Sequence, residues 1–228
     1  MQNKKIKITN EIPIFPLPNV VFFPKTLLPL HIFEERYRKM VVDALAGSNQ
    51  IGMALLKQGW EKNYFGSPDV YEIGCVGDIQ FSEKLDKGKF NIMLYALSRV
   101  KILKFVQNKP YRIARVKILR DANFDYDGFD EQFEAERFLR SVRKYLSEMG
   151  VEKVNEFLRL NLHSYSFESI VNQVATVLDF MIHEKQTLLE MDSIELRYDK
   201  LKSLLQDKHI TLKIAKNVKY VPENPIWN

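Results

Sequence analysis

Six side chains in the first third of the sequence have chemistry that suits a binding site. Three of them are the aromatic residues Trp60, Tyr64 and Phe65, which lie in a stretch of turn-forming composition between positions 58 and 71. Aromatic side chains on an exposed loop gain little unless they contact a partner, so such a loop is a better binding candidate than a buried segment. We therefore predict that this loop contributes to a site for a polypeptide or a protein partner.

The other three candidates, His31, Glu34 and Arg36, lie where a proline-rich extended segment is expected to change into a helix. Glu34 and Arg36 could face a ligand as a pair of opposite charges, and it is equally consistent that they position the helix against Arg99. His31 is more readily explained as a capping or packing residue than as an acid–base group. We retain all three as candidate binding residues, with no catalytic role assigned.

The sequence lacks the motifs that carry most known catalytic chemistry. It has no G-x-x-x-x-G-K-[ST] phosphate loop, no G-x-S-x-G nucleophile turn and no H-E-x-x-H metal motif. Its one cysteine, Cys75, also makes a structural zinc site improbable. We therefore expect a protein that is not an enzyme, with no catalytic residues, no cofactor and no metal.

Charge is distributed unevenly along the chain. Residues 1–120 carry a net charge of +10, whereas residues 121–228 carry −5, which together give the overall +5. A basic first half could bind RNA, and this is the alternative to polypeptide binding. Nucleic acid is the less favoured partner, because no stretch interleaves aromatic and basic residues as a base-stacking surface requires.

Composition is typical of a folded protein that functions in the cytoplasm. No apolar run approaches the roughly 18 residues of a membrane span, so we expect no membrane association. The basic start of the sequence is followed by a proline-broken segment rather than a signal peptide. A single cysteine fits a reducing compartment.

The candidate residues are positioned by a segment, Ile12–Gly47, that begins as an extended run containing five prolines and then becomes a helix. Proline cannot continue a helix, so the first part should form edge strand and turns. Helical spacing after Pro29 predicts one buried face that includes Phe33, Tyr37 and Met40, which we expect to plug the fold.

Residues 51–57 and then 72–119 show the composition and period of strands. We expect a buried strand at 51–57, strands on either side of a turn at 86–89, and a further strand at 99–106 whose alternation slips near Leu103, as at a β-bulge. A last strand follows at 112–119. Together these predict a small closed or half-closed β-barrel with one inserted helix.

Beyond position 121 the period becomes helical. Apolar stripes predict a helix that ends at Gly150, a shorter one at 151–162, a long one that starts at an N-cap Ser166 and runs to about Leu189, and a last one whose capping box starts at Asp192. Four helices with short connections predict a bundle. We therefore expect an α+β fold with three parts: a barrel domain at 1–120, a helical bundle domain at 121–207 and a C-terminal tail at 208–228.

Several motifs resemble the Lon protease N-terminal (substrate-binding) domain family, in the same order and over about residues 11–206. The opening resembles the family pattern in IFPLPNVVFFPKTLLPLHIFEERYRKMVVDAL, and the later helical signature is similar to HEKQTLLEMDSIELRYDKL. Between them lie IGMALL, YEIGCVGDI, SRVKIL and PYRIARV. The resemblance is specific because several motifs agree in both order and spacing.

The resemblance implies a PUA-like β-barrel followed by a helical bundle. It also implies a non-catalytic, proteolysis-related binding module of bacterial type that recognises unfolded or exposed polypeptide segments or a protein partner. The ATPase and Ser–Lys protease modules that follow this domain in Lon are absent from the sequence, so we expect a stand-alone form. The apolar helical faces are compatible with a homo-oligomer.

Overall fold

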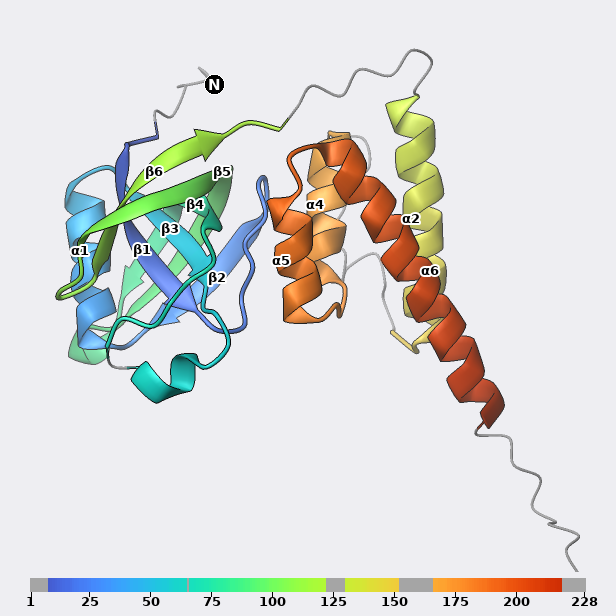
Figure 1. Cartoon of the computed structure of the whole chain (residues 1–228), viewed down its shortest axis with the longest axis horizontal. Helices are drawn as coiled ribbons and strands as arrows, with labels where there is room; N and C mark the ends of the chain where they lie inside the picture. The colour runs from blue at the N-terminus through green and yellow to red at the C-terminus, as the bar shows by residue number, and fades with distance from the viewer. Residues whose placement is uncertain (1–7, 65, 122–129, 152–165, 219–228) are drawn as a thin grey trace, which may run out of the picture.

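The computed structural model describes residues 8–64, 66–121, 130–151 and 166–218. In the first 121 residues the chain forms a mixed sheet with one α-helix, and in the later residues it is helical (Figure 1). The strands are β1 (Glu11–Leu17), β2 (Leu27–Ile32), β3 (Gln50–Leu55), β4 (Ile73–Lys84), β5 (Phe90–Gln107) and β6 (Arg112–Leu119). The helices are α1 (Glu35–Ala46), α2 (Glu131–Glu148), α4 (Phe167–Val177), α5 (Ile182–Glu190) and α6 (Ile194–Val218), with short 3₁₀ turns η1 (Trp60–Asn63) and η2 (Asp86–Gly88).

The sheet has the order β2-β5-β4-β3-β1-β6, and β5 also pairs with β6. Five strands therefore form a ring of pairing, and β2 lies outside it on the first half of β5. The α+β class is confirmed, but the sheet is not a clean barrel. Two strands were expected at 90–96 and 99–106, and that prediction is wrong: β5 is one 18-residue strand that serves both halves of the sheet.

The predicted bulge at Leu103 is confirmed by the register. Ile102 pairs with Val116 and Lys104 with Arg115, so Leu103 has no partner on β6. A bulged residue bends its strand and re-aims the neighbouring side chains. Here it leaves the Leu103 side chain 54% exposed on the outer surface.

Helix α1 covers one core of the sheet through Tyr37, Met40 and Val41, which are buried. Phe33 is not part of that plug, contrary to the prediction, because its side chain is 60% exposed. The helix begins only after Glu34, so Phe33 still follows strand alternation and points opposite to the buried Ile32.

The helical part follows the expected boundaries at two of its ends. Helix α2 stops before Gly150, whose positive φ suits glycine, and Ser166 caps α4 by accepting a hydrogen bond from the Ser169 amide. The predicted long helix from Ser166 is instead two helices. Residues 178–181 separate them, and the Glu184 side chain accepts a hydrogen bond from the Met181 amide to start α5.

The structure corrects two further predictions about the helical part. Ser193, and not Asp192, caps α6 by accepting from the Leu196 amide. Helix α6 runs on to Val218, so residues 208–218 of the predicted tail are helical. The helix predicted at 151–162 lies outside the described residues, apart from Val151, as does the boundary segment 122–129.

Both parts of the chain contribute to one apolar core. The cluster under α2, α4, α5 and α6 also contains Val21 and Phe23 from the β1–β2 connection and Leu55 from β3. The intervening Phe22 is buried in the other direction, in the core of the sheet. Successive residues of an extended segment point to opposite sides, so one short run supplies both cores.

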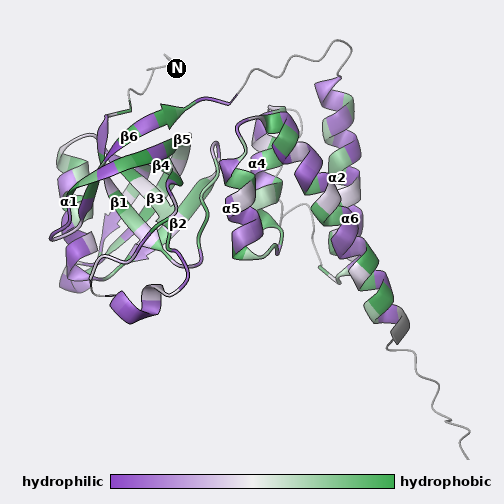
Figure 2. Cartoon of the chain, in the orientation of Figure 1, coloured by the Kyte–Doolittle hydropathy of each residue, from purple (hydrophilic) through white to green (hydrophobic). Residues whose placement is uncertain are grey.

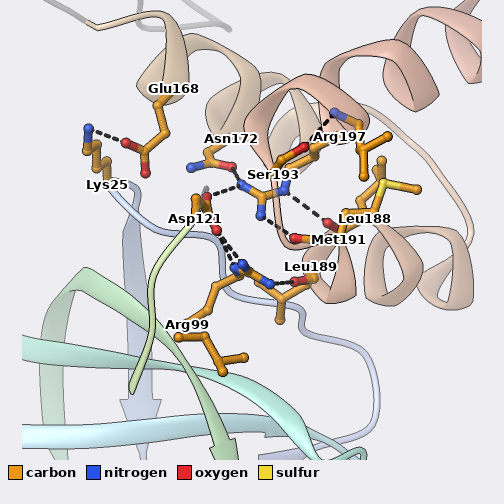
Figure 3. Close-up of polar contacts among 12 residues, drawn as sticks. Lys25, Arg99, Asp121, Glu168, Asn172, Leu188, Leu189, Met191, Ser193 and Arg197 are labelled. Atoms are coloured by element: carbon orange, nitrogen blue, oxygen red, sulfur yellow. Dashed lines mark hydrogen bonds and ion pairs between the residues drawn. The ribbon is translucent and has the colours of Figure 1, made fainter. Parts of the chain in front are cut away.

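A polar network joins the same two parts (Figure 3). Asp121, just after β6, lies between two buried arginines, Arg99 of β5 and Arg197 of α6. Its carboxylate accepts from Arg99 Nε at 2.7 Å and from Arg197 Nη1 at 3.3 Å. The proposed contact of Glu34 or Arg36 with Arg99 is therefore wrong, because Arg99 faces the helices.

The two arginines also satisfy the end of α5. Arg197 donates to the carbonyls of Leu188 and Met191, and Arg99 donates to that of Leu189. The last carbonyls of a helix have no partners inside it and carry partial negative charge, and α5 has no basic residue in its last turn. Guanidinium groups from β5 and α6 supply the missing donors, which fixes α5 against the sheet.

Candidate functional site

Two adjoining hollows lie between the loop after β3 and the β5–β6 hairpin. One, of about 320 Å³, has apolar side chains of Val70, Ile102 and Phe105 among its lining residues. The other, of about 510 Å³, is lined by Arg36 and by the turns at 66–67 and 108–110. Ser67 and Asn108 line both, so the hollows form one surface depression, which we name the loop groove. Its complete lining is Arg36, Lys57, Gly66, Ser67, Pro68, Asp69, Val70, Glu72, Ile102, Leu103, Lys104, Phe105, Asn108, Lys109, Pro110 and Arg112.

Four of the six predicted residues come together at one end of this groove. The Tyr64 hydroxyl donates to Glu34 Oε1 at 2.7 Å, and Arg36 Nε donates to Glu34 Oε2 at 3.0 Å. The Trp60 and Tyr64 rings meet edge to face, with centroids 5.6 Å apart. Tyr64 is therefore docked on the start of α1 with Trp60 packed against it, and Arg36 connects this pair to the groove wall.

Arg36 is held by three contacts. Besides its ion pair with Glu34, its guanidinium lies 4.6 Å from the centroid of the Tyr37 ring and 5.5 Å from that of Tyr64. The hydrogen bond to Glu34, and then burial, raise the pKa of Tyr64. Burial raises the pKa of Tyr37 to about 12, although the nearby Arg36 opposes this shift. Both hydroxyls are consequently neutral at physiological pH, and that of Tyr64 donates its hydrogen bond to Glu34.

The opposite wall is formed by the hairpin. The Arg112 guanidinium lies 5.3 Å from the centroid of the Phe105 ring, and burial lowers the pKa of Arg112. At this distance the ring attracts the cation, which orders the two side chains together. The wall thus offers an apolar surface beside a fixed positive charge, and Asp69 and Glu72 add carboxylates across the groove.

The structure does not place the other two predicted residues, His31 and Phe65, with this cluster. His31 lies on β2, where Nδ1 is 2.8 Å from Asn91 Oδ1 and the ring stacks with Phe33 at 6.2 Å. The contacts of His31 are thus with its neighbours on the sheet, whereas Phe65 lies outside the described residues. Trp60 is partly buried against the sheet core, so it also has a packing role.

Reasoning from the sequence missed the hairpin side of the site. Leu103, Phe105 and Arg112 come from strands that the pattern assigns to the core. The one available signal is the slip in alternation near Leu103, which marks the residue that the bulge turns outward. The proximity of this hairpin to the loop at 66–70 depends on ring closure, which no local pattern specifies.

Among the described residues, no group of three or more His, Cys, Asp or Glu side chains is placed to bind a metal ion. Along the same residues, no helix combines the length and apolarity that a membrane crossing requires.

Comparison with known proteins identifies relatives over most of the chain. A "Lon protease" of Dictyoglomus thermophilum is 26% identical over 99% of this chain and 28% of its own length. A "Lon protease" of Flavobacterium johnsoniae is 28% identical over 86% of this chain and 24% of its own length. The chain thus spans about a quarter of the length of the curated relatives it matches.

Solved structures share the fold. The N-terminal domain of the Mycobacterium avium complex Lon protease superposes with a TM-score of 0.65 at 12% identity, and a Lon N-terminal domain protein from Xanthomonas campestris with 0.59 at 18% identity. Each match covers 86% of this chain and 98% of the other. The family model described as "ATP-dependent protease La (LON) substrate-binding domain" matches residues 11–207. The chain therefore belongs to the Lon substrate-binding domain family, as its motifs predict.

Proposed function

We propose that the chain is a non-catalytic module that binds exposed segments of polypeptide in the loop groove. The observation that carries this proposal is a surface depression in which the half-exposed Leu103 and the partly exposed Phe105 lie beside Arg112, with the carboxylates of Asp69 and Glu72 in the same lining. Apolar side chains of a bound segment would pack on the partly exposed Phe105 and on the exposed Leu103. Its backbone amides and carbonyls would meet the polar groups at the rim, as is usual for binding clefts.

The membership of the family supports a substrate-binding role, and the features of this chain make that role specific. Leu103 is half exposed because of the bulge, although burying a leucine fully would stabilise the fold by about 1.5–3 kcal/mol. The Trp60 and Tyr64 rings form a second apolar element near the loop groove, because Arg36, which lines the groove, lies over the Tyr64 ring. We also propose, from the family resemblance, that the ring of strands is a PUA-like barrel and that the helices form a bundle.

A matched pair of variants tests the proposal. Leu103 lines the groove and is 54% exposed, and Leu27 lies on β2 outside it and is 55% exposed. Binding of fluorescently labelled, reduced and carboxymethylated α-lactalbumin would be measured by anisotropy, with the native folded protein as the comparison. We expect Leu103→Ser to weaken binding about tenfold, whereas Leu27→Ser leaves both binding and melting temperature nearly unchanged.

Salt separates this function from nucleic-acid binding, for which the comparisons give no support. Association through apolar contacts should persist as ionic strength rises, whereas phosphate contacts weaken steeply. Equal binding by the two serine variants, or binding of mixed RNA that is stronger than that of the unfolded polypeptide, would overturn the proposal.

A further inference from the structure

Helices α2 and α6 lie side by side on the side of the molecule away from the sheet, and α4 and α5 lie between this pair and the sheet (Figure 1). A hollow of about 430 Å³ runs between them, and we name it the helix groove. Its wall on α6 extends from Tyr198 to Lys213, which corresponds to about 22 Å at the helical rise of about 1.5 Å per residue. This surface is separate from the loop groove and shares no residue with it.

The lining of the helix groove is basic although the surrounding sequence is acidic. The cations Arg137, Lys144, Lys202 and Lys213 line it, the His209 ring lies among them, and none of its lining residues carries a carboxylate. Residues 121–228 have a net charge of −5, so this collection of cations is opposite to the local average. A like-charged surface of this kind favours an anionic occupant.

Two of these cations already have partners within the helices. Arg137 pairs with Glu134 and Lys202 with Asp199, each one turn away, and the His209 ring contacts Glu148 at 3.3 Å. Lys144 and Lys213, one on each wall, form no ion pair with any described residue. They are therefore the charges that an incoming carboxylate can reach at the smallest cost.

The floor between the walls is apolar. Phe138 and Tyr198 are buried there, with ring centroids 5.1 Å apart, and Leu205 is buried as well. Ile210 is 50% exposed at the mouth, and Ile214, one turn further along α6, is 58% exposed. Figure 2 shows hydrophilic and hydrophobic residues interspersed along both helices. The occupant must therefore combine acidic groups with apolar side chains.

The geometry points to a helix as the form of this occupant. Both walls are helices, whose mid-chain amides and carbonyls are bonded internally, so they offer no free backbone edge to an extended strand. A helical segment satisfies its own backbone and can place a row of side chains between two others by ridge-into-groove packing. A nucleic acid would need exposed rings for stacking, and both aromatic rings of the floor are buried.

We propose that the helix groove is a docking site for an amphipathic helix of a partner protein that carries carboxylates on both sides of an apolar stripe. The carboxylates pair with Lys144 and Lys213, and the stripe covers Ile210 and the floor. This interaction is independent of polypeptide binding in the loop groove, so each can fail without the other.

Three designed peptides test the proposal. They share an alanine–leucine helical framework of about 18 residues and differ only at the positions that flank the leucine stripe, which are Glu, Gln or Lys. Binding to the full chain would be measured by fluorescence anisotropy at low and moderate salt. We expect the Glu peptide to bind at least tenfold more tightly than the Gln peptide, and the Lys peptide not to bind.

A charge swap makes the site specific. Lys144→Glu with Lys213→Glu should abolish binding of the Glu peptide and create binding of the Lys peptide. Arg140→Glu with Lys200→Glu is the matched control, since it changes the same charge on the same two helices at exposed positions that do not line the groove. The control should keep the behaviour of the unaltered chain: tight binding of the Glu peptide, weaker binding of the Gln peptide and no binding of the Lys peptide.

Three outcomes would overturn the proposal. They are equal binding of the Glu and Gln peptides, an equal loss in the control variant, and displacement of the Glu peptide by a single-stranded oligonucleotide at a lower concentration than by unlabelled Glu peptide. Melting temperatures of all variants establish that they fold. The altered lysines and Arg140 are exposed, so the melting temperatures should change little.

Discussion

Two regions of this molecule pair arginine with a carboxylate, and they do so in opposite surroundings. In the network that joins the sheet to the helices, the Arg99 and Arg197 side chains are 1% and 0% exposed. At the end of the loop groove, Arg36 and Glu34 are about one quarter exposed. The buried arginine–carboxylate pairs therefore fix two parts of the fold to each other, whereas the pair of Arg36 with Glu34 remains in contact with solvent.

The difference lies in what else satisfies each arginine. Arg197 has five donors in a fixed fork, and they reach Asp121, Asn172 and two backbone carbonyls. Arg36 has one carboxylate and two aromatic rings. A guanidinium held by four hydrogen bonds cannot exchange partners cheaply, whereas Arg36, with a single carboxylate partner, can also donate to a ligand.

The largest effect should come from removing the carboxylate that two buried arginines share. We expect Asp121→Ala to lower the free energy of unfolding by about 3–5 kcal/mol, because two buried cations would then lie together without compensation. Urea unfolding measures this. Glu11→Ala is the control, since its pair with Arg115 is about half exposed and should contribute less than about 1 kcal/mol. Similar losses of unfolding free energy in Asp121→Ala and Glu11→Ala would show that burial does not make the Asp121 network more stabilising than an exposed ion pair.

Arg36→Ala should show the reverse behaviour. Because its ion pair is partly solvated, unfolding free energy should fall by less than about 1 kcal/mol. Binding of unfolded α-lactalbumin should weaken by about tenfold, which is about 1.4 kcal/mol. Titration and melting of the same samples compare the two. A large loss of stability would place Arg36 with the buried arginines instead.

A smaller, pH-dependent effect is expected at Asp43. The hydrogen bond from the Tyr111 hydroxyl, at 2.7 Å, lowers the pKa of Asp43 below its ordinary value of 3.8. The folded state therefore favours the carboxylate, and this contribution is present above pH 3.8 and is lost as pH falls through the lower pKa of the folded state. The gap in melting temperature between the unaltered chain and Asp43→Asn should close in that range.

Tyr111→Phe removes the same hydrogen bond and is the matched variant for Asp43→Asn. Its own gap to the unaltered chain should also narrow as pH falls below 3.8. A gap that stays constant from pH 6 to pH 3 would show that the bond does not favour the ionised form of Asp43.

The smallest effect is expected for Phe33→Ala. Its ring is 60% exposed and contacts His31 at the surface, so the free energy of unfolding should change by less than about 0.5 kcal/mol. Met40→Ala, from the buried face of α1, should cost about 2–5 kcal/mol and is the comparison. A cost for Phe33→Ala close to that for Met40→Ala would restore Phe33 to the core.

Local signals in the sequence predicted the parts of the fold that local chemistry decides. The cap at Ser166, the stop at Gly150 and the bulge at Leu103 each depend on a few neighbouring residues, and all three are confirmed. Phe33 was assigned to the wrong face because the start of α1 decides its direction. Apolar spacing cannot place that start to within one residue.

Features that depend on distant partners could not be predicted in this way. The break between α4 and α5 is an exception, because the Glu184 side chain that accepts from the Met181 amide is a local signal; it was missed because the buried Leu178 and Phe180 continue the apolar pattern through the break. For the candidate site, the sequence pointed to Trp60, Tyr64, Glu34 and Arg36 as separate candidates, but not to the contacts among them. It did not supply the hairpin wall, because a strand pattern does not specify which loop lies opposite.

The run from Val21 to Phe23, which contributes to both cores, has a consequence for synthesis of the chain. The sheet is complete only once β6 has been made, which ends at Leu119, and the helical members of the shared core extend from Ala135 to Leu205, so on the order of ten seconds of translation separate the completed sheet from the completed core. During that interval the sheet can close around Phe22, while Val21, Phe23 and Leu55 stay uncovered on its surface. The nascent chain therefore passes through a state with an exposed apolar patch, and that state is the point at which a chaperone or a neighbouring chain would compete with the helices.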